Sequence, residues 1–472
     1  MRKLSILACF ILLTSPLAIT QANAATPKLG GACSKVGSFG DTPKVRFICV
    51  KSGKKLVWQQ WNKPSSNNNS TSNNASSTSC PIAGSTKIVG GKRYMCVGTG
   101  RQSDFLWDAG TPVSFAAKIP ISLPVAQDTS AGGITFSNVM SHIVDIPKVA
   151  WQRVQDVIAA NPPLAVPHTL AVGPNTTSVT KTLEESLLKK EFQLWEGFQQ
   201  TTYLNVVLYN TQDIDWATSE LQAVFKAKGY VFEDPSGFSR IIKQPCQQSE
   251  TAAPGQKSGV AVGDCFGGAG GSIPNSSDSM ENLGVTTAGK WDPTDSGEVS
   301  HEYTHTVQAA QWIGTAAKDR GDYGHIFAPC WINEGQPNAT GIAASSKSYQ
   351  QYLDKRNATE TVGPLDPKFP GWSAANLKEY LYSQIPNGSV ANSCYQNGPL
   401  YQMGYSVGMA ATEALVAIGG PQSTMALYAR GADGDSFAEA FQKVYGISWD
   451  KGSTILGQVL ATEYAQSPFK AR

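Results

Sequence analysis

The sequence predicts an α+β fold, in which a lobe built on a mixed sheet is followed by a helical lobe. Helix and strand patterns alternate in the middle of the chain, and the part that follows Ser436 has a helical pattern. Two pairs of closely spaced cysteines near the N-terminus predict two small β modules in front of this fold.

The first lobe begins with a helix, a strand and a second helix. The first helix is expected to begin near Thr182, where Glu185 completes a capping box. Thr202–Tyr209 alternates as a strand does, with leucine and valine on one side. The second helix is expected to begin at Asp213 and to end at Gly229.

Composition and the N-terminus place the protein outside the cytoplasm. The chain has 472 residues, a net charge of +2 and 16% charged residues, so it offers no basic field for nucleic acid. Residues 1–24 predict a signal peptide, because Arg2-Lys3 precede an apolar run and the small-residue site Ala22-Asn23-Ala24. No later segment has the length of a membrane span. We therefore expect a secreted protein without a transmembrane segment.

Four cysteines form a repeated pattern. Cys33 and Cys49 are 16 residues apart (49 minus 33), and so are Cys80 and Cys96 (96 minus 80). A valine and then a tryptophan follow each interval. A unit this short buries too little core to hold itself, so we expect a tandem repeat of β-hairpins with one disulfide in each.

The repeats set the domain boundaries. We expect repeat 1 at residues 25–63, a flexible Ser/Asn-rich linker at 64–79 and repeat 2 at 80–112, followed by the main domain at 113–472. The repeats resemble short cysteine-containing repeats of secreted actinobacterial proteins. They are candidates for cell-wall or glycan contact through three tryptophans, which otherwise form the core of each module: Trp58, Trp61 and Trp107.

The other four cysteines lie in the main domain. Cys246 and Cys265 would close a local loop, which leaves Cys330 to pair with Cys394. A structural zinc ion held by all four thiolates is the rival use, but the wide, irregular spacing and the secretory signal favour disulfides.

The segment His301-Glu302-Tyr303-Thr304-His305 has the pattern HExxH in a chain with only five histidines. On a helix the two histidines project from one face, about one turn apart, and can hold one Zn²⁺. Glu302 follows the first ligand and can act as general base toward a zinc-bound water. We therefore predict a zinc-dependent hydrolase site here.

A second motif follows at Trp331-Ile332-Asn333-Glu334-Gly335. Together the two motifs resemble those of the gluzincins, metallopeptidases whose third zinc ligand is a glutamate on a later helix, and WINEG is similar to the WLNEG of the aminopeptidase N family. The resemblance implies a zincin-like catalytic domain with its cleft between the two lobes. It also implies that His301, His305 and Glu334 bind zinc and that Glu302 is the base.

Two features depart from the gluzincin pattern. The interval from the second histidine to Glu334 is 29 residues (334 minus 305), longer than is usual in the family, so we expect an insertion to loop out around Asp319–His325. Pro337 fits a helix only in its first turn, so the helix with Glu334 should barely have begun there. His325 or a nearby aspartate is the alternative third ligand.

Tyr401 opens a segment, Gly398–Tyr405, that is similar to the Tyr-x-x-Gly segment of the same superfamily. That resemblance implies that Tyr401 donates a hydrogen bond to the oxyanion formed by attack on a peptide carbonyl. Tyr405 is the other candidate. The alternative is that Tyr401 packs at the entrance of a core helix.

Glu281 stands in Met280-Glu281-Asn282, which is similar to the end of the GAMEN motif, whose glutamate binds the amino terminus of a substrate. In that family the motif borders an edge strand, and Leu283–Lys290 occupies the corresponding place. The glycine- and serine-rich stretch Gly267–Ser279 predicts a loop, so the alternative for Glu281 is an exposed loop carboxylate.

These observations predict a secreted zinc metalloprotease that hydrolyses peptide bonds in a peptide or protein substrate. The alternative is a non-catalytic cell-surface or cell-wall binding protein on a degenerate peptidase scaffold. The complete HExxH motif favours the enzyme, because loss of catalysis usually changes those residues.

Overall fold

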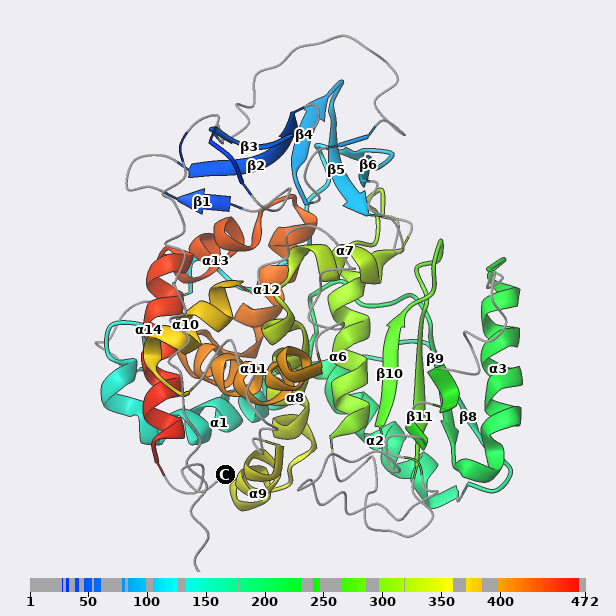
Figure 1. The fold of residues 1–472 in the computed structure, drawn as a ribbon. Helices are drawn as coiled ribbons and strands as arrows, with labels where there is room; N and C mark the ends of the chain where they lie inside the picture. Colours follow the sequence, from blue (N-terminus) through cyan, green and yellow to red (C-terminus); the bar gives the residue numbers. More distant parts are fainter. Residues whose placement is uncertain are drawn as a thin grey trace, which may run out of the picture. The chain divides into compact units, whose positions relative to one another are not determined.

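The computed structural model has a mixed α+β fold, as the sequence predicts (Figure 1). It describes most of residues 79–125, 133–230, 265–285, 297–359, 371–383 and 398–466, with short stretches of 28–60 and 241–246. The chain divides into two compact units, Met1–Ser65 and Ser66–Arg472. The predicted signal peptide at 1–24 and nearly all of the linker at 64–79 lie outside the described residues.

The two predicted repeats have the same strand register. The first unit contains β1 (Phe39–Asp41), β2 (Arg46–Ser52) and β3 (Lys55–Gln60). The second repeat contains β4 (Thr86–Val89), β5 (Lys92–Gly98), β6 (Phe105–Trp107) and β7 (Thr111–Pro112). Cys49 lies opposite Trp58 across one antiparallel pair, and Cys96 lies opposite Trp107 across the other. In each repeat the residue before the first cysteine also bridges the residue before this tryptophan. Two copies of one module are expected to share this register, so the observation agrees with a tandem repeat.

Two of the predicted disulfides are present, Cys80–Cys96 and Cys246–Cys265. Cys33 and Cys330 are also disulfide-bonded. The side chains of Cys49 and Cys394 lie outside what the structure describes, so these two pairings stay predictions. Bonded sulfurs cannot act as thiolate ligands, so the rival zinc site made of four cysteines is wrong.

The second unit contains a four-stranded sheet in the order β10-β11-β9-β8. Its strands are β8 (His168–Val172), β9 (Leu204–Tyr209), β10 (Gly267–Ser272) and β11 (Ser279–Gly284). Three of them run parallel, and β10 is antiparallel at the edge.

The strand predicted at Thr202–Tyr209 is confirmed by β9. The loop predicted at Gly267–Ser279 is wrong, because it contains β10. The edge strand expected at Leu283–Lys290 is wrong as well, because Leu283 and Gly284 are the last residues of the inner strand β11, and residues 286–290 lie outside the described residues.

Helices pack on both faces of this sheet and form the helical lobe. The helices with described bounds that precede β10 are η1 (Val139–Asp145), α1 (Ile146–Ala160), α2 (Ser178–Leu194), η2 (Thr211–Asp213) and α3 (Ile214–Ala227). Those that follow β11 are α6 (Glu298–Ala310), α7 (Arg320–Phe327), α8 (Cys330–Ser345), α9 (Tyr349–Thr359), α10 (Ala374–Ser383), α11 (Gly398–Gly419), α12 (Pro421–Ala432), α13 (Phe437–Tyr445) and α14 (Trp449–Tyr464). Within the described part of the chain, no helix is both long and apolar enough to cross a membrane.

Helix α1 comes before the first helix that the sequence predicts. Pro147 occupies its first turn, and the buried residues Ile146, Ala150 and Val154 follow at intervals of four. That proline and that spacing are sequence signals of a helix start and a buried helix face. The helix expected near Thr182 begins at Ser178, and the helix expected from Asp213 is α3.

Helices α3 and α6 cover opposite faces of the sheet. Alternate residues of β9 point to the two faces. Leu204, Val206 and Leu208 belong to the large core that includes residues of α6. Val207 and Tyr209 belong to a smaller core that includes residues of α3. Both faces of the central strand are therefore buried, and α6 lies between the sheet and the helical lobe (Figure 1).

Glycines in β10 allow α6 to approach the sheet. A Cβ atom on Gly270 would lie 2.2 Å from the carbonyl oxygen of Glu302, and one on Gly268 would lie 3.3 Å from the Cγ of Glu302. The two glycines alternate along the strand and face the same side. Glycine is unfavourable in a strand, and close approach of another backbone is a common reason for it.

Repeat 2 is fixed to the main domain through Asp108. One carboxylate oxygen accepts hydrogen bonds from the backbone N–H groups of Met95 and Gly110, at 3.1 and 3.0 Å. The other accepts a hydrogen bond of 3.0 Å from the hydroxyl of Tyr323 in α7. Arg93 adds a hydrogen bond of 2.6 Å from its guanidinium to the Ala432 carbonyl. The second repeat is thus hydrogen-bonded to α7 and to the end of α12.

We predict that Asp108→Ala destabilises the second unit by about 2–4 kcal/mol, because three buried donors lose their acceptor. The measurement is the midpoint of urea unfolding. Asp450→Ala is the control, because the exposed ion pair between Asp450 and Lys378 should contribute no more than about 0.5 kcal/mol. Equal midpoints for the two variants would contradict the role of Asp108.

Candidate metal centre

Helix α6 presents the HExxH residues to the inside of the unit. Its N-cap is Gly297, with a φ of 90° that glycine tolerates and other residues rarely adopt. His301 and Glu302 are buried, at 6% and 5% exposure. A solvated surface helix, the simplest alternative for this motif, does not match this burial.

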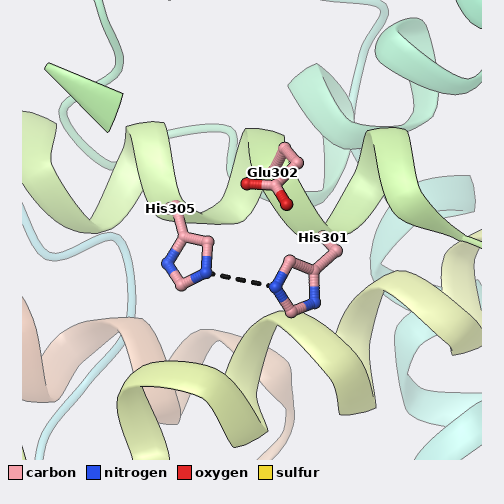
Figure 2. A group of neighbouring side chains, drawn as sticks. All are labelled: His301, Glu302 and His305. Atoms are coloured by element: carbon pink, nitrogen blue, oxygen red, sulfur yellow. Dashed lines mark hydrogen bonds between the residues drawn. The ribbon is translucent and has the colours of Figure 1, made fainter. Parts of the chain in front are cut away.

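Three potential ligand atoms converge at this helix. The Nε2 atoms of His301 and His305 are 3.1 Å apart (Figure 2). One carboxylate oxygen of Glu334 lies 3.6 Å from the first Nε2 atom and 3.4 Å from the second. Ligands about 2.0–2.1 Å from a tetrahedral zinc ion are roughly 3.3–3.4 Å apart. The nitrogen and oxygen set and its spacing therefore fit Zn²⁺.

Glu302 lies beside these ligand atoms. Its carboxylate comes within 4.8 Å of the ring nitrogens of His301 and His305. It approaches them from the same helix (Figure 2), whereas Glu334 reaches them from α8. Glu334 completes the set more closely, because one of its oxygens is within 3.6 Å of both Nε2 atoms. Glu302 therefore lies next to the three ligand atoms, where a general base would act, and is not one of them.

The Nδ1 nitrogens of both imidazoles are hydrogen-bonded to side-chain amides. The Nδ1 atom of His301 is 2.7 Å from the Asn338 side-chain oxygen, and the amide N–H of Asn338 donates to the carbonyl of Tyr405 at 2.9 Å. The Nδ1 atom of His305 is 2.9 Å from the side-chain oxygen of Gln308. A carbonyl can only accept, so Asn338 must turn its oxygen toward His301, whose Nδ1 then carries the hydrogen. A neutral His301 consequently directs the lone pair of Nε2 into the site.

Burial and mutual charge set the protonation of this group. Burial opposes the charged form of His301, but the hydrogen bond with Glu334 and the charge of Glu302 raise its pKa to about 9. Burial likewise opposes the charged form of His305, and the charge of Glu334 raises its pKa above the usual value. Burial alone would raise the pKa of Glu334, but the charge of His305 and the hydrogen bonds with both histidines hold it well below the usual value. A cation at this place is thus electrostatically favoured.

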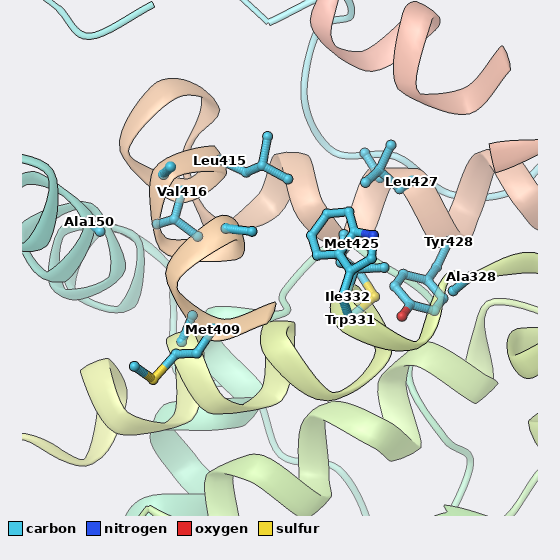
Figure 3. Close-up of a cluster of buried hydrophobic side chains, with 14 of the residues drawn as sticks. Ala150, Ala328, Trp331, Ile332, Met409, Leu415, Val416, Met425, Leu427 and Tyr428 are labelled. Carbon is cyan, nitrogen blue, oxygen red and sulfur yellow. The ribbon is translucent and has the colours of Figure 1, made fainter. Parts of the chain in front are cut away.

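Helix α8 carries Glu334 and is anchored in the core of the helical lobe. Trp331 and Ile332 pack in the same cluster as Met425 and Tyr428 of α12 (Figure 3). All of α8 except Asn338 is buried. The prediction about Pro337 is wrong, because Pro337 lies in the middle of this 16-residue helix and not in its first turn.

The interval between the motifs contains a helix. The insertion expected to loop out around Asp319–His325 is α7, whose N-cap Asp319 accepts a hydrogen bond from the Gly321 backbone N–H. Burial lowers the pKa of His325 to about 4, against the charge of Glu334, so His325 is neutral near pH 7. An oxygen of Glu334 lies within 3.6 Å of both Nε2 atoms, which favours Glu334 over His325 as third ligand.

Tyr401 and Tyr405 both lie at the candidate metal centre, on α11. Their hydroxyl groups are 2.5 Å apart. The Tyr405 ring stacks on the imidazole of His301, with ring centres 5.8 Å apart. Burial and the charge of Glu334 raise the pKa of both phenols well above the usual value, so both stay protonated as donors. The resemblance named Tyr401 first, and the structure places Tyr405 at the same site.

Glu281 lies beneath α6. It belongs to β11, the second strand from the edge, and is 0% exposed. Its charge contributes to the raised pKa of Tyr303, a residue of α6. The alternative of an exposed loop carboxylate is therefore wrong. A fully buried side chain does not meet a substrate ammonium, so Glu281 has no part in the function proposed below.

Comparisons of this chain with protein-family models, curated proteins and solved structures gave no match.

We predict that zinc binding to the chelator-treated protein releases about one proton at pH 7. A metal displaces the proton of a ligating imidazole, and the His301 pKa of about 9 keeps that proton bound at pH 7. The apparent zinc affinity should therefore rise with pH, by up to roughly tenfold per unit, and level off near the pKa. Calorimetry in buffers of different ionisation enthalpy measures the proton count. A pH-independent affinity between pH 6 and 8 would contradict this prediction.

Proposed function

We propose that this protein is a secreted zinc metallopeptidase of the gluzincin kind. The observation that carries the proposal is the convergence of His301, His305 and Glu334, whose ligand atoms have the spacing of a tetrahedral zinc site. The HExxH and WINEG motifs agree with it. A mixed-sheet lobe followed by a helical lobe is the arrangement that the resemblance implies for a zincin-like domain.

The residues around this set divide the work of peptide hydrolysis. A zinc ion held there would polarise a carbonyl group and lower the pKa of a water molecule. Glu302 takes the proton of the attacking water and passes it to the leaving amine. Tyr401 and Tyr405 are protonated donors beside the ligands and stabilise the developing oxyanion. Together these groups form a base and oxyanion donors around one buried centre.

The environment and targeting of the enzyme are also proposals. The disulfides fit an oxidising compartment outside the cytoplasm. Glycan or cell-wall contact through the repeats would use Trp58 and Trp107, which are half-buried, while Trp61 lies outside the described residues. The ammonium of Lys87 lies 4.2 Å from the centre of the Trp107 ring, a contact that occupies one aromatic face.

We predict that the purified protein contains one zinc ion per chain and that Glu302→Gln abolishes peptide hydrolysis without loss of zinc. Glutamine keeps the volume of the side chain but cannot take the proton, so the rate should fall by roughly 10²–10⁴-fold. Mass-spectrometric metal counting and a peptide-library digest give the two readouts.

His305→Ala is the matched variant for this test, and it should lose both zinc and activity. Unchanged zinc content in His305→Ala would overturn the ligand assignment. Full zinc occupancy without hydrolysis by the wild type would instead favour a binding protein on a peptidase scaffold.

We predict that Tyr401→Phe or Tyr405→Phe lowers kcat and leaves the zinc content unchanged. Loss of an oxyanion donor typically costs about 10²–10³-fold in kcat. The variant with the larger loss in kcat at constant KM identifies the donor. If both variants keep the wild-type kcat, neither phenol acts on the oxyanion.

A further inference from the structure

Pro337 interrupts the hydrogen bonding of α8. In an α-helix the carbonyl of each residue accepts from the N–H four residues later, and proline has no N–H. The carbonyl of Asn333 therefore receives no helical hydrogen bond from position 337. Pro337 and Asn333 are both buried, so this carbonyl needs a donor from inside the fold. The affected carbonyl belongs to the residue just before Glu334.

Gln308 of α6 supplies a donor at this place. Its side-chain nitrogen donates to the Asn333 carbonyl at 3.2 Å and to the side-chain oxygen of Gln336 at 2.8 Å. Gln308 is 3% exposed and uses both of its N–H groups in these two bonds. A glutamine on the motif helix therefore bonds to the ligand helix at the turn that contains the proline.

The same contacts fix the direction of the Gln308 amide. The carbonyl of Asn333 can only accept, so the nitrogen of the amide faces α8 and its oxygen faces α6. That oxygen lies 2.9 Å from Nδ1 of His305, which must then carry the hydrogen. His305, when neutral, consequently turns the lone pair of Nε2 toward Glu334, whose oxygen is 3.4 Å away.

We propose that Gln308 is a positioning residue that ties the orientation of His305 to the proline-interrupted turn of α8. One side chain then sets the tautomer of one ligand and holds the helix that carries another. This inference deepens the proposed function and rests on the metal site named there. Gln308 is not itself a ligand of that site and acts only through His305 and α8.

Three variants separate the two tasks of Gln308. Gln308→Leu removes both and should weaken zinc binding by roughly 10–100-fold, the usual effect of losing such an outer partner, and lower the unfolding temperature. Gln308→Glu keeps an acceptor for His305 but loses the donors to α8, so zinc affinity should be retained while the unfolding temperature falls. Pro337→Ala restores a backbone N–H for Asn333. Added to Gln308→Leu, it should recover the unfolding temperature and leave the zinc affinity low.

The readouts are zinc affinity, by competition with a chromogenic chelator, and thermal unfolding of the chelator-treated protein. Gln311→Leu is the matched control. Gln311 is a buried glutamine of the same region, and its side chain donates to the carbonyls of Gln199 and Val307 and not to α8. It should lower the unfolding temperature without changing zinc affinity.

The outcomes distinguish this inference from the proposed function. A wild-type chain that binds no zinc would overturn the proposed function and, with it, the role of Gln308 at His305. Zinc binding by the wild type with equal affinity in Gln308→Leu would overturn the present inference alone. Recovery of zinc affinity by Pro337→Ala in the Gln308→Leu background would also overturn it, because the effect on His305 would then come only through α8.

Discussion

The candidate site depends on one constraint, the close approach of β10 and α8 to the backbone of α6. On one side Gly270 of β10 leaves room for the Glu302 carbonyl, and on the other Gly341 of α8 leaves room for the His301 backbone, where a Cβ atom would come within 2.9 Å of the nitrogen. The motif helix is thus held between a strand and a helix that both use glycine at the contact. This closeness brings Glu334 to the two imidazoles. A side chain at either glycine would have to move α6, and the ligand spacing would change with it.

A second close contact places the tyrosines. Gly335 and Gly408 face each other where α8 and α11 cross, and a Cβ atom on Gly335 would lie 2.2 Å from the backbone of Gly408. Small residues at a crossing let two helices approach more closely than side chains otherwise permit. Because Glu334 and Tyr405 lie within one turn of these glycines, the phenols and the third ligand reach the same centre.

The sequence could predict the parts whose signals are local. HExxH, the alternation of β9 and the start of α3 each follow from a short pattern, and the structure contains all three. It could not predict β10, because its glycines are there for a contact with α6 and resemble a loop when the chain is read alone. Pro337 could not be placed for the same reason, because the donor to the Asn333 carbonyl comes from Gln308 on another helix, 29 residues earlier in the chain than the proline (337 minus 308). Asn338 gave no signal, because an amide one turn after Glu334 has meaning only once His301 is beside it.

The two repeats show how one module can differ in its surroundings. Their strand registers agree around the cysteine and the tryptophan, so position 59 of the first repeat corresponds to position 108 of the second. The first repeat has Gln59 there, and the second has Asp108, a carboxylate that accepts from the backbone of its own module and from Tyr323. An ionised carboxylate can only accept, whereas an amide oxygen shares its side chain with donors that would also need partners in this buried place. The aspartate therefore suits a module that is hydrogen-bonded to α7 of the main domain.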